Sequence, residues 1–199
     1  METKDHFRLA KWVLRQERNR LPHTFSAGLI VGSVLPDCNP FTYLSGVRRG
    51  QGLHGHNAEV TEKKICGLLA AGADTESFLS GIRLGTALHY LADAFTYPHH
   101  NYYPGTLADH VAYERSLHRT FTAFLSETEP PSLPPATDFP AYFADMLSLY
   151  RQIQKNEQTD CRFITQMCGM AFAIALAPHR EEEAADPEPD CPGALPLAR

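Results

Sequence analysis

The sequence has little of what disulfide-bonded, exported or membrane-spanning proteins need. Its five cysteines are odd in number and include no C-x-x-C pair, so we expect reduced thiols and no disulfide framework. The first residues, METKDHFRLAKW, have no apolar stretch after their positive charge and so do not resemble a secretory signal. The longest apolar run, residues 167–177, is too short to cross a bilayer. The sequence therefore predicts a cytoplasmic protein without a transmembrane segment.

Excess basic charge and strand-type patterning are also lacking. The net charge of −5 argues against a broad electrostatic surface for nucleic acid, so no stable nucleic-acid complex is expected. No segment shows convincing alternation of apolar and polar residues, and no internal repeat is visible. With 199 residues and a 43% apolar fraction, the chain suits one substantial domain of the all-α class.

Helical periodicity, with proline and glycine as interruptions, indicates where the helices lie. The first predicted helix starts with Asp5 as its N-cap, and Gly72 is predicted to follow the end of a later one. The apolar stretches that we expect to be helical cover residues 5–19, 24–35, 59–71, 75–97, 107–126, 139–155 and 160–176. PPSLPPA (130–136) is predicted to be a stiff connector. We expect one compact multi-helix domain over residues 1–177 and an acidic, Pro-rich disordered tail over 178–199.

Histidine is the residue that the sequence has in excess. Seven of its ten histidines fall between residues 54 and 118, which indicates a site. His89 and Asp93 lie four residues apart on a predicted helix, so their side chains share one face, and His110 and Glu114 repeat the spacing. The histidine pair at 99 and 100 lies between them. Imidazole nitrogen and carboxylate oxygen are ligands that zinc binds at about 2.0–2.2 Å, so the sequence predicts a metal site.

Three familiar metal architectures are excluded by motifs that the sequence lacks. There is no E-x-x-H, which paired di-iron bundles need, and no H-E-x-x-H of zinc proteases. The adjacent His-Asp dipeptide of HD-type phosphohydrolases is also missing.

The order of the remaining motifs resembles the zinc-dependent phospholipase C / S1-P1 nuclease family, and within it a small uncharacterised bacterial branch. The motifs are a histidine opening the first helix, GSVLPD, a histidine after it, then H-x-x-x-D-x5-H and H-x-x-x-E. They extend from His6 to Glu114, over half the chain. The resemblance implies the all-α phospholipase C/P1 nuclease fold and two to three bound Zn²⁺ ions.

The resemblance also implies which residues bind each ion. The first site would take Asp37, His56, His89 and Asp93, the second His99, His110 and Glu114, and the third His6 with Asp93 as the bridge. His54 stays open as the alternative to His56. His99 is preferred to His100 because it lies six residues after Asp93, as in the family.

The third site is where the sequence departs from the family. Secreted members complete it with the amino group and carbonyl of an N-terminal tryptophan. This chain begins with Met1, five residues before His6. Another ligand or water would then complete the site, or the site would be empty.

The function that the resemblance implies is hydrolysis of a phosphoester or phosphodiester by a metal-activated water. Zinc lowers the pKa of bound water toward about 7. Asp37 would orient the attacking water and accept its proton. The expected partner is a phospholipid or a smaller phosphoester-bearing molecule, with phospholipase C-like activity first and a single-strand nuclease second. The alternative of another class is a zinc-binding homologue without turnover.

Overall fold

Helices account for every regular element in the part of the chain that the computed structural model describes, which is residues 1–15, 17, 19–38, 58–70, 72–130 and 138–185. This confirms the predicted all-α class. The elements are α1 (Thr3–Val13), α2 (His23–Cys38), α4 (Ala58–Leu69), α5 (Phe78–Ala94), the short 3-10 helix η1 (Tyr97–His99), α6 (Leu107–Glu127), α7 (Phe139–Gln152) and α8 (Glu157–Ala185).

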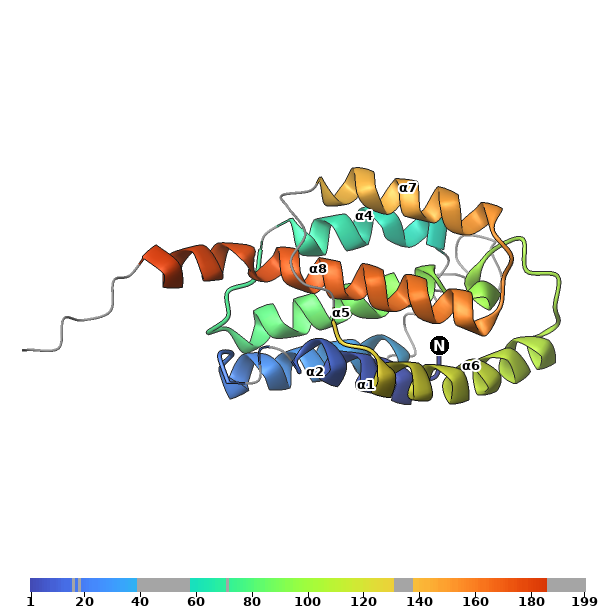
Figure 1. Cartoon of the computed structure of the whole chain (residues 1–199), viewed down its shortest axis with the longest axis horizontal. Helices are drawn as coiled ribbons and strands as arrows, with labels where there is room; N and C mark the ends of the chain where they lie inside the picture. Colours follow the sequence, from blue (N-terminus) through green and yellow to red (C-terminus); the bar gives the residue numbers. More distant parts are fainter. Residues whose placement is uncertain (16, 18, 39–57, 71, 131–137, 186–199) are drawn as a thin grey trace, which may run out of the picture.

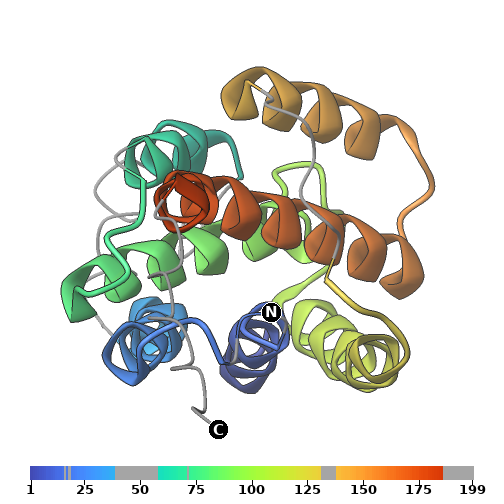
Figure 2. The same ribbon diagram turned by 60° about the vertical axis from the view of Figure 1, so that its left-hand side comes forward.

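The helices pack around α5 and α8. Helices α1, α2 and α6 lie on one side of this pair, and α4 and α7 lie on the other (Figures 1 and 2). Large side chains from five helices are fully buried in the core between these layers: Trp12, Phe25, Leu88, Phe121 and Ile164. The central position of α5 places its polar residues deep inside the fold.

Local signals located some helix ends correctly and others wrongly. Gly72 has a φ of 66°, the left-handed conformation expected of a glycine just after a helix. The following helix starts three residues later than predicted, because the Ser77 side chain caps it by accepting a hydrogen bond from the Ser80 N–H. The prediction that Asp5 caps the first helix is wrong. Glu2 precedes α1, and Asp5 lies inside the helix, fully buried against α6.

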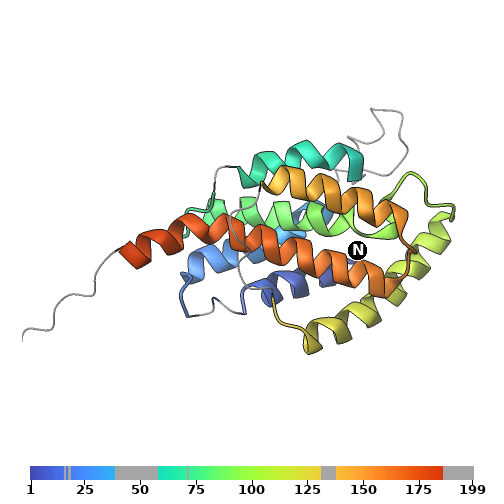
Figure 3. The same ribbon diagram turned by 45° about the horizontal axis from the view of Figure 1, so that its top comes forward.

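Two prolines that were predicted to end helices lie within them. Helix α2 continues through Pro36 to Cys38, so Asp37 is on a helix. Helix α8 continues through Pro178 to Ala185, although the sequence predicts a disordered tail from that proline onward. Glutamate and alanine, which make up residues 181–185, are strong helix formers and favour this continuation. The last turns of α8 extend past the other helices (Figure 3), and residues 186–199 lie outside the described part of the chain.

Helix α8 contains an apolar stretch longer than the run at residues 167–177. Over Glu157–Ala177 it is long and apolar enough to cross a membrane, judged by length and composition. However, 72% of that window is buried inside the structure, so its apolar surface already packs against other helices. One buried helix of this kind is weak evidence for a membrane span.

Glycines bring α2 and α5 into very close contact. Each helix carries two of them four residues apart, at 28 and 32 on α2 and at 81 and 85 on α5. A Cβ on Gly32 would lie 2.1 Å from the Ile82 carbonyl oxygen, and one on Gly85 would lie 2.1 Å from that of Leu29. Backbone therefore meets backbone at this interface, and the distance between the two helices fixes how their side chains meet.

Replacing Gly85 with Ala should lower the free energy of unfolding by roughly 1–3 kcal/mol, because an added methyl group here can be relieved only by moving one backbone. Urea denaturation would measure the loss. Gly67→Ala on α4 is the matched control, since a Cβ there has no neighbour within 4 Å and alanine favours the helix. Equal stabilities of the two variants would contradict the close contact.

Candidate metal centre

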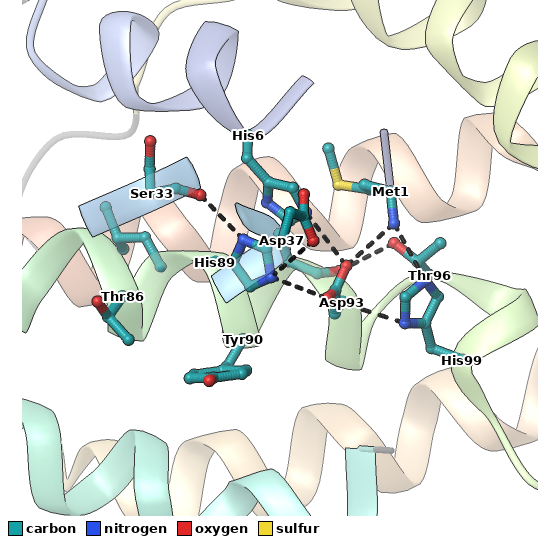
Figure 4. Close-up of polar contacts among 12 residues, drawn as sticks. Met1, His6, Ser33, Asp37, Thr86, His89, Tyr90, Asp93, Thr96 and His99 are labelled. Atoms are coloured by element: carbon teal, nitrogen blue, oxygen red, sulfur yellow. Dashed lines mark hydrogen bonds and ion pairs between the residues drawn. The ribbon is translucent and has the colours of Figure 1, made fainter. Parts of the chain in front are cut away.

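Helix α5 presents His89 and Asp93 toward α2 and α1, one turn apart and each only 1% exposed (Figure 4). The His89 Nε2 lies 3.3 Å from Asp93 Oδ2. The other ring nitrogen, Nδ1, lies 2.9 Å from the Ser33 carbonyl oxygen on α2. A carbonyl only accepts hydrogen bonds, so we assign the proton to Nδ1, which leaves the Nε2 lone pair facing Asp93.

Helices α2 and α1 add one side chain each to this group. Asp37 Oδ1 on α2 lies 3.6 Å from His89 Nε2. His6 on α1 stacks on the His89 ring with 3.8 Å between centroids, and its Nε2 lies 3.3 Å from Asp93 Oδ1. Burial, together with the neighbouring His89, lowers the pKa of His6 to about 4. The His6 ring is therefore neutral at pH 7, as a metal ligand must be.

A second group forms where η1 meets the start of α6. Glu114 Oε1 lies 3.2 Å from His99 Nε2 and 3.1 Å from His110 Nε2. A capping box between Thr106 and Asp109 fixes the first turn of α6, just before His110. These side chains are 12–17% exposed, so this group is more open than the one on α5.

The Met1 amino group lies between the two groups. Its nitrogen is 3.0 Å from Asp93 Oδ1 and from His99 Nε2 (Figure 4). It is also 3.0 Å from Glu114 Oε1. Burial opposes its charge, but the carboxylates of Asp93 and Glu114 outweigh burial and raise the pKa of the amino group to about 11. The amino group is therefore in contact with a carboxylate of each group.

The donor atoms fit a metal centre. Ligands bound tetrahedrally at about 2.0–2.2 Å stand roughly 3.3–3.5 Å apart, close to the 3.1–3.3 Å separations in both groups. Asp37 Oδ2 and His6 Nε2 are buried and have no hydrogen-bond partner among the described residues, which leaves lone pairs for an ion. The set of imidazole, carboxylate and amine donors is one that zinc accepts.

A third group of similar residue types does not fit a metal ion. His118 Nδ1 lies 2.5 Å from Asp5 Oδ1, too close for two ligands of one ion but suited to a charge-assisted hydrogen bond. Glu2 nearby pairs with Lys4 at 2.6 Å. His118 is on α6, four residues after Glu114, and Asp5 is on α1. The hydrogen bond between them therefore holds α1 against α6. This contact keeps the start of α1 beside both metal groups.

The structure places seven of the eight predicted ligands in or beside these two groups: His6, Asp37, His89, Asp93, His99, His110 and Glu114. His56 and its alternative His54 lie outside the described residues. His100 points away from both groups and stacks on Tyr102, with ring centroids 4.8 Å apart. The burial of the amino group has no local signal in the sequence, because it depends on how α1 packs.

The fold and the site together define an all-α protein with a candidate zinc centre. The chain matches the family model described as zinc dependent phospholipase C over residues 5–173. It therefore belongs to the zinc-dependent phospholipase C family, as the motifs from His6 to Glu114 indicated. No curated protein and no solved structure matched the chain. Family membership implies zinc, and these residues are the candidate ligands for it.

The metal-free protein should be most stable between about pH 6.5 and 8, chiefly because the pKa values of His6 and of the Met1 amino group lie outside their usual ranges. Below pH 6.5 the unfolded chain protonates His6, whereas the folded chain does so only near pH 4, so acid favours unfolding. Above pH 8.0 the unfolded chain loses the amino-group proton that the fold retains to about pH 11, so base also favours unfolding. Each effect is on the order of 3 kcal/mol at its limit.

Thermal unfolding in EDTA from pH 4 to 10 would measure this dependence. The lowered pKa values of Asp93 and Glu114 act in the same direction as that of His6, at still lower pH. A melting temperature that keeps rising from pH 8 to 10 would contradict the buried ammonium group.

Proposed function

We propose that this protein is a zinc-dependent hydrolase of phosphoesters or phosphodiesters that binds two to three ions. The observation that carries the proposal is that two histidine–carboxylate groups lie side by side, with Asp93 of the first group in contact with His99 of the second. The chain that holds them belongs to the zinc-dependent phospholipase C family. Asp93 Oδ2 lies 3.3 Å from His89 Nε2 and 3.8 Å from His99 Nδ1, so one carboxylate reaches ligands of both groups.

The ligands divide into three sets by their positions. The first ion would be held by Asp37, His89 and Asp93, together with His56 or His54. The second would be held by His99, His110 and Glu114. The third would be held by His6, Asp93 and the Met1 amino group. When bound, zinc supplies an acidified water and stabilises negative charge on phosphoryl oxygens. The His89 ring of the first set has a fixed orientation, because its Nδ1–H donates to the Ser33 carbonyl. The contact between Asp5 and His118 holds α1, which carries His6 of the third set, against α6.

The chain's own residues also suggest where substrate is handled. The Asp37 side chain is 15% exposed, whereas those of His89 and Asp93 are 0% and 2% exposed. Asp37 can therefore contact both the metal group and solvent, and we assign it the role of orienting the attacking water and accepting its proton. The more exposed His99 and Glu114 mark the side from which a phosphoester would approach.

The substrate class that we favour is a phospholipid or a smaller phosphodiester of that type. The family's phospholipase C activity supports it, and the net charge of −5 disfavours a polyanionic nucleic acid. A single-strand nuclease activity is the second candidate, since the same kind of centre suits any phosphodiester.

The test is zinc analysis of the purified protein combined with three substrates: a chromogenic phosphodiester, phosphatidylcholine vesicles and single-stranded DNA. We expect at least two zinc equivalents per chain and EDTA-sensitive hydrolysis of the first two substrates. Faster hydrolysis of DNA would instead support the nuclease candidate. Two bound equivalents without any turnover would identify a zinc-binding homologue, and fewer than two would contradict the proposed centre.

A further inference from the structure

Asp160 is a fully buried carboxylate that lies outside both metal groups and binds donors from three different elements. Its Oδ1 accepts a hydrogen bond of 2.6 Å from the Tyr150 hydroxyl on α7. Its Oδ2 accepts one of 2.8 Å from the Tyr113 hydroxyl on α6 and one of 3.0 Å from the Tyr97 backbone N–H on η1. Asp160 itself is on α8, so one side chain connects four elements.

This carboxylate is ionised at neutral pH. Burial raises the pKa of Asp160 to about 6, while hydrogen bonds from Tyr150 and the other donors oppose that rise. An ionised carboxylate only accepts hydrogen bonds, and a buried one is costly unless donors surround it. The three donors are therefore held in place by the charge that they satisfy, and they fix the elements that carry them.

Two of the three donors belong to the elements that supply the second metal group. Tyr97 begins η1, whose last residue is His99. Tyr113 directly precedes Glu114 on α6. The third donor, Tyr150, is on α7, which contributes no residue to either metal group. The Asp160 contacts thus connect η1 to α6, the two elements whose His99 Nε2 and Glu114 Oε1 lie 3.2 Å apart.

We propose that Asp160 is a positioning residue for the second metal group, acting through Tyr97 and Tyr113 on the spacing of His99, His110 and Glu114. The inference rests on the proposed function, which makes those three residues metal ligands. Partners that orient metal ligands from outside the coordination shell typically change metal affinity by roughly 10–100-fold when removed. A purely structural role for Asp160 would give no reason for one tyrosine to matter more to zinc than another.

The two tyrosines provide a matched test of this distinction. Tyr113→Phe and Tyr150→Phe each remove one hydroxyl donor from the same carboxylate and keep the aromatic ring. Because the Tyr150 bond is the shorter and its side chain is fully buried, Tyr150→Phe should destabilise the protein at least as much. Only Tyr113→Phe releases α6, so only this variant should weaken zinc binding at the second group, by roughly 10-fold or more.

Competition with a chromophoric zinc chelator would measure the affinities, and urea denaturation the stabilities. Glu114→Gln shows which zinc belongs to the second group, because Glu114 is a ligand of that group and of no other set. We expect Tyr150→Phe to keep that zinc within about twofold of wild type and Asp160→Ala to lose the most, roughly 10–100-fold. Equal zinc affinities of the two tyrosine variants would overturn the inference. Absence of the second zinc from the wild type would instead show that the proposed function fails.

Discussion

Replacing Asp93 with Asn should remove zinc from both metal groups and lower hydrolytic activity by more than roughly 100-fold. Oδ1 of Asp93 lies 3.0 Å from the Met1 amino group and 3.3 Å from His6, and Oδ2 lies 3.3 Å from His89. Asparagine keeps the shape of the side chain but has no charge and only one oxygen. A metal ligand should matter more than the outer contacts that cost roughly 10–100-fold.

Zinc analysis and activity measurements on Asp93→Asn would test this expectation. Asp145→Asn is the matched control, because Asp145 is exposed on α7, away from both groups. The control should keep full zinc content and activity. An Asp93→Asn variant with wild-type zinc content would show that this carboxylate does not bridge the two groups.

Adding two residues before Met1 should remove one zinc equivalent and lower activity by at least roughly 10-fold. The amino group is buried 3.0 Å from both Asp93 and Glu114, so the added residues have no room there. The extension also converts the amino group to an amide, which has neither a positive charge nor a lone pair that binds a metal. Without metal the extended protein would lose a counter-ion of the two carboxylates. With metal it would lose the nitrogen that, once deprotonated, completes the third set.

Native mass spectrometry with zinc analysis would count the ions in the extended protein. The control carries the same two residues after Arg199, at the other end of the chain. It should match the unextended protein in zinc content and activity. Identical zinc content in the N-terminally extended protein would exclude the amino group as a ligand.

The sequence predicted much of this centre because its ligands come in short, regular spacings. His89 and Asp93, like His110 and Glu114, are four residues apart, and a helix places such pairs on one face. The fold class followed from the same periodicity. The motif order then pointed to the family that the chain matches over residues 5–173.

Other features depend on packing between distant segments and had no local signal. The η1 turn, and not the spacing, directs His99 toward Glu114 while His100 stacks on Tyr102. The Met1 amino group is buried against Asp93, 92 positions away, and Asp5 contacts His118, 113 positions away. The donors to Asp160 come from residues 97, 113 and 150, so nothing in the sequence near 160 could reveal them.

Proline was the signal that misled prediction. It removes a backbone donor and usually ends or kinks a helix, so helix ends were expected at Pro36 and Pro178. Both helices continue past their prolines. For Asp37 the difference is functional, because its place on α2 holds its Oδ1 3.6 Å from His89 Nε2.

Crystals of the zinc-loaded protein, with anomalous diffraction measured at the zinc edge, would locate the ions directly. We predict one peak beside Asp37, His89 and Asp93, another among His99, His110 and Glu114, and none between Asp5 and His118. Absence of a peak from either of the first two groups at full zinc loading would contradict the centre on which the proposed function depends.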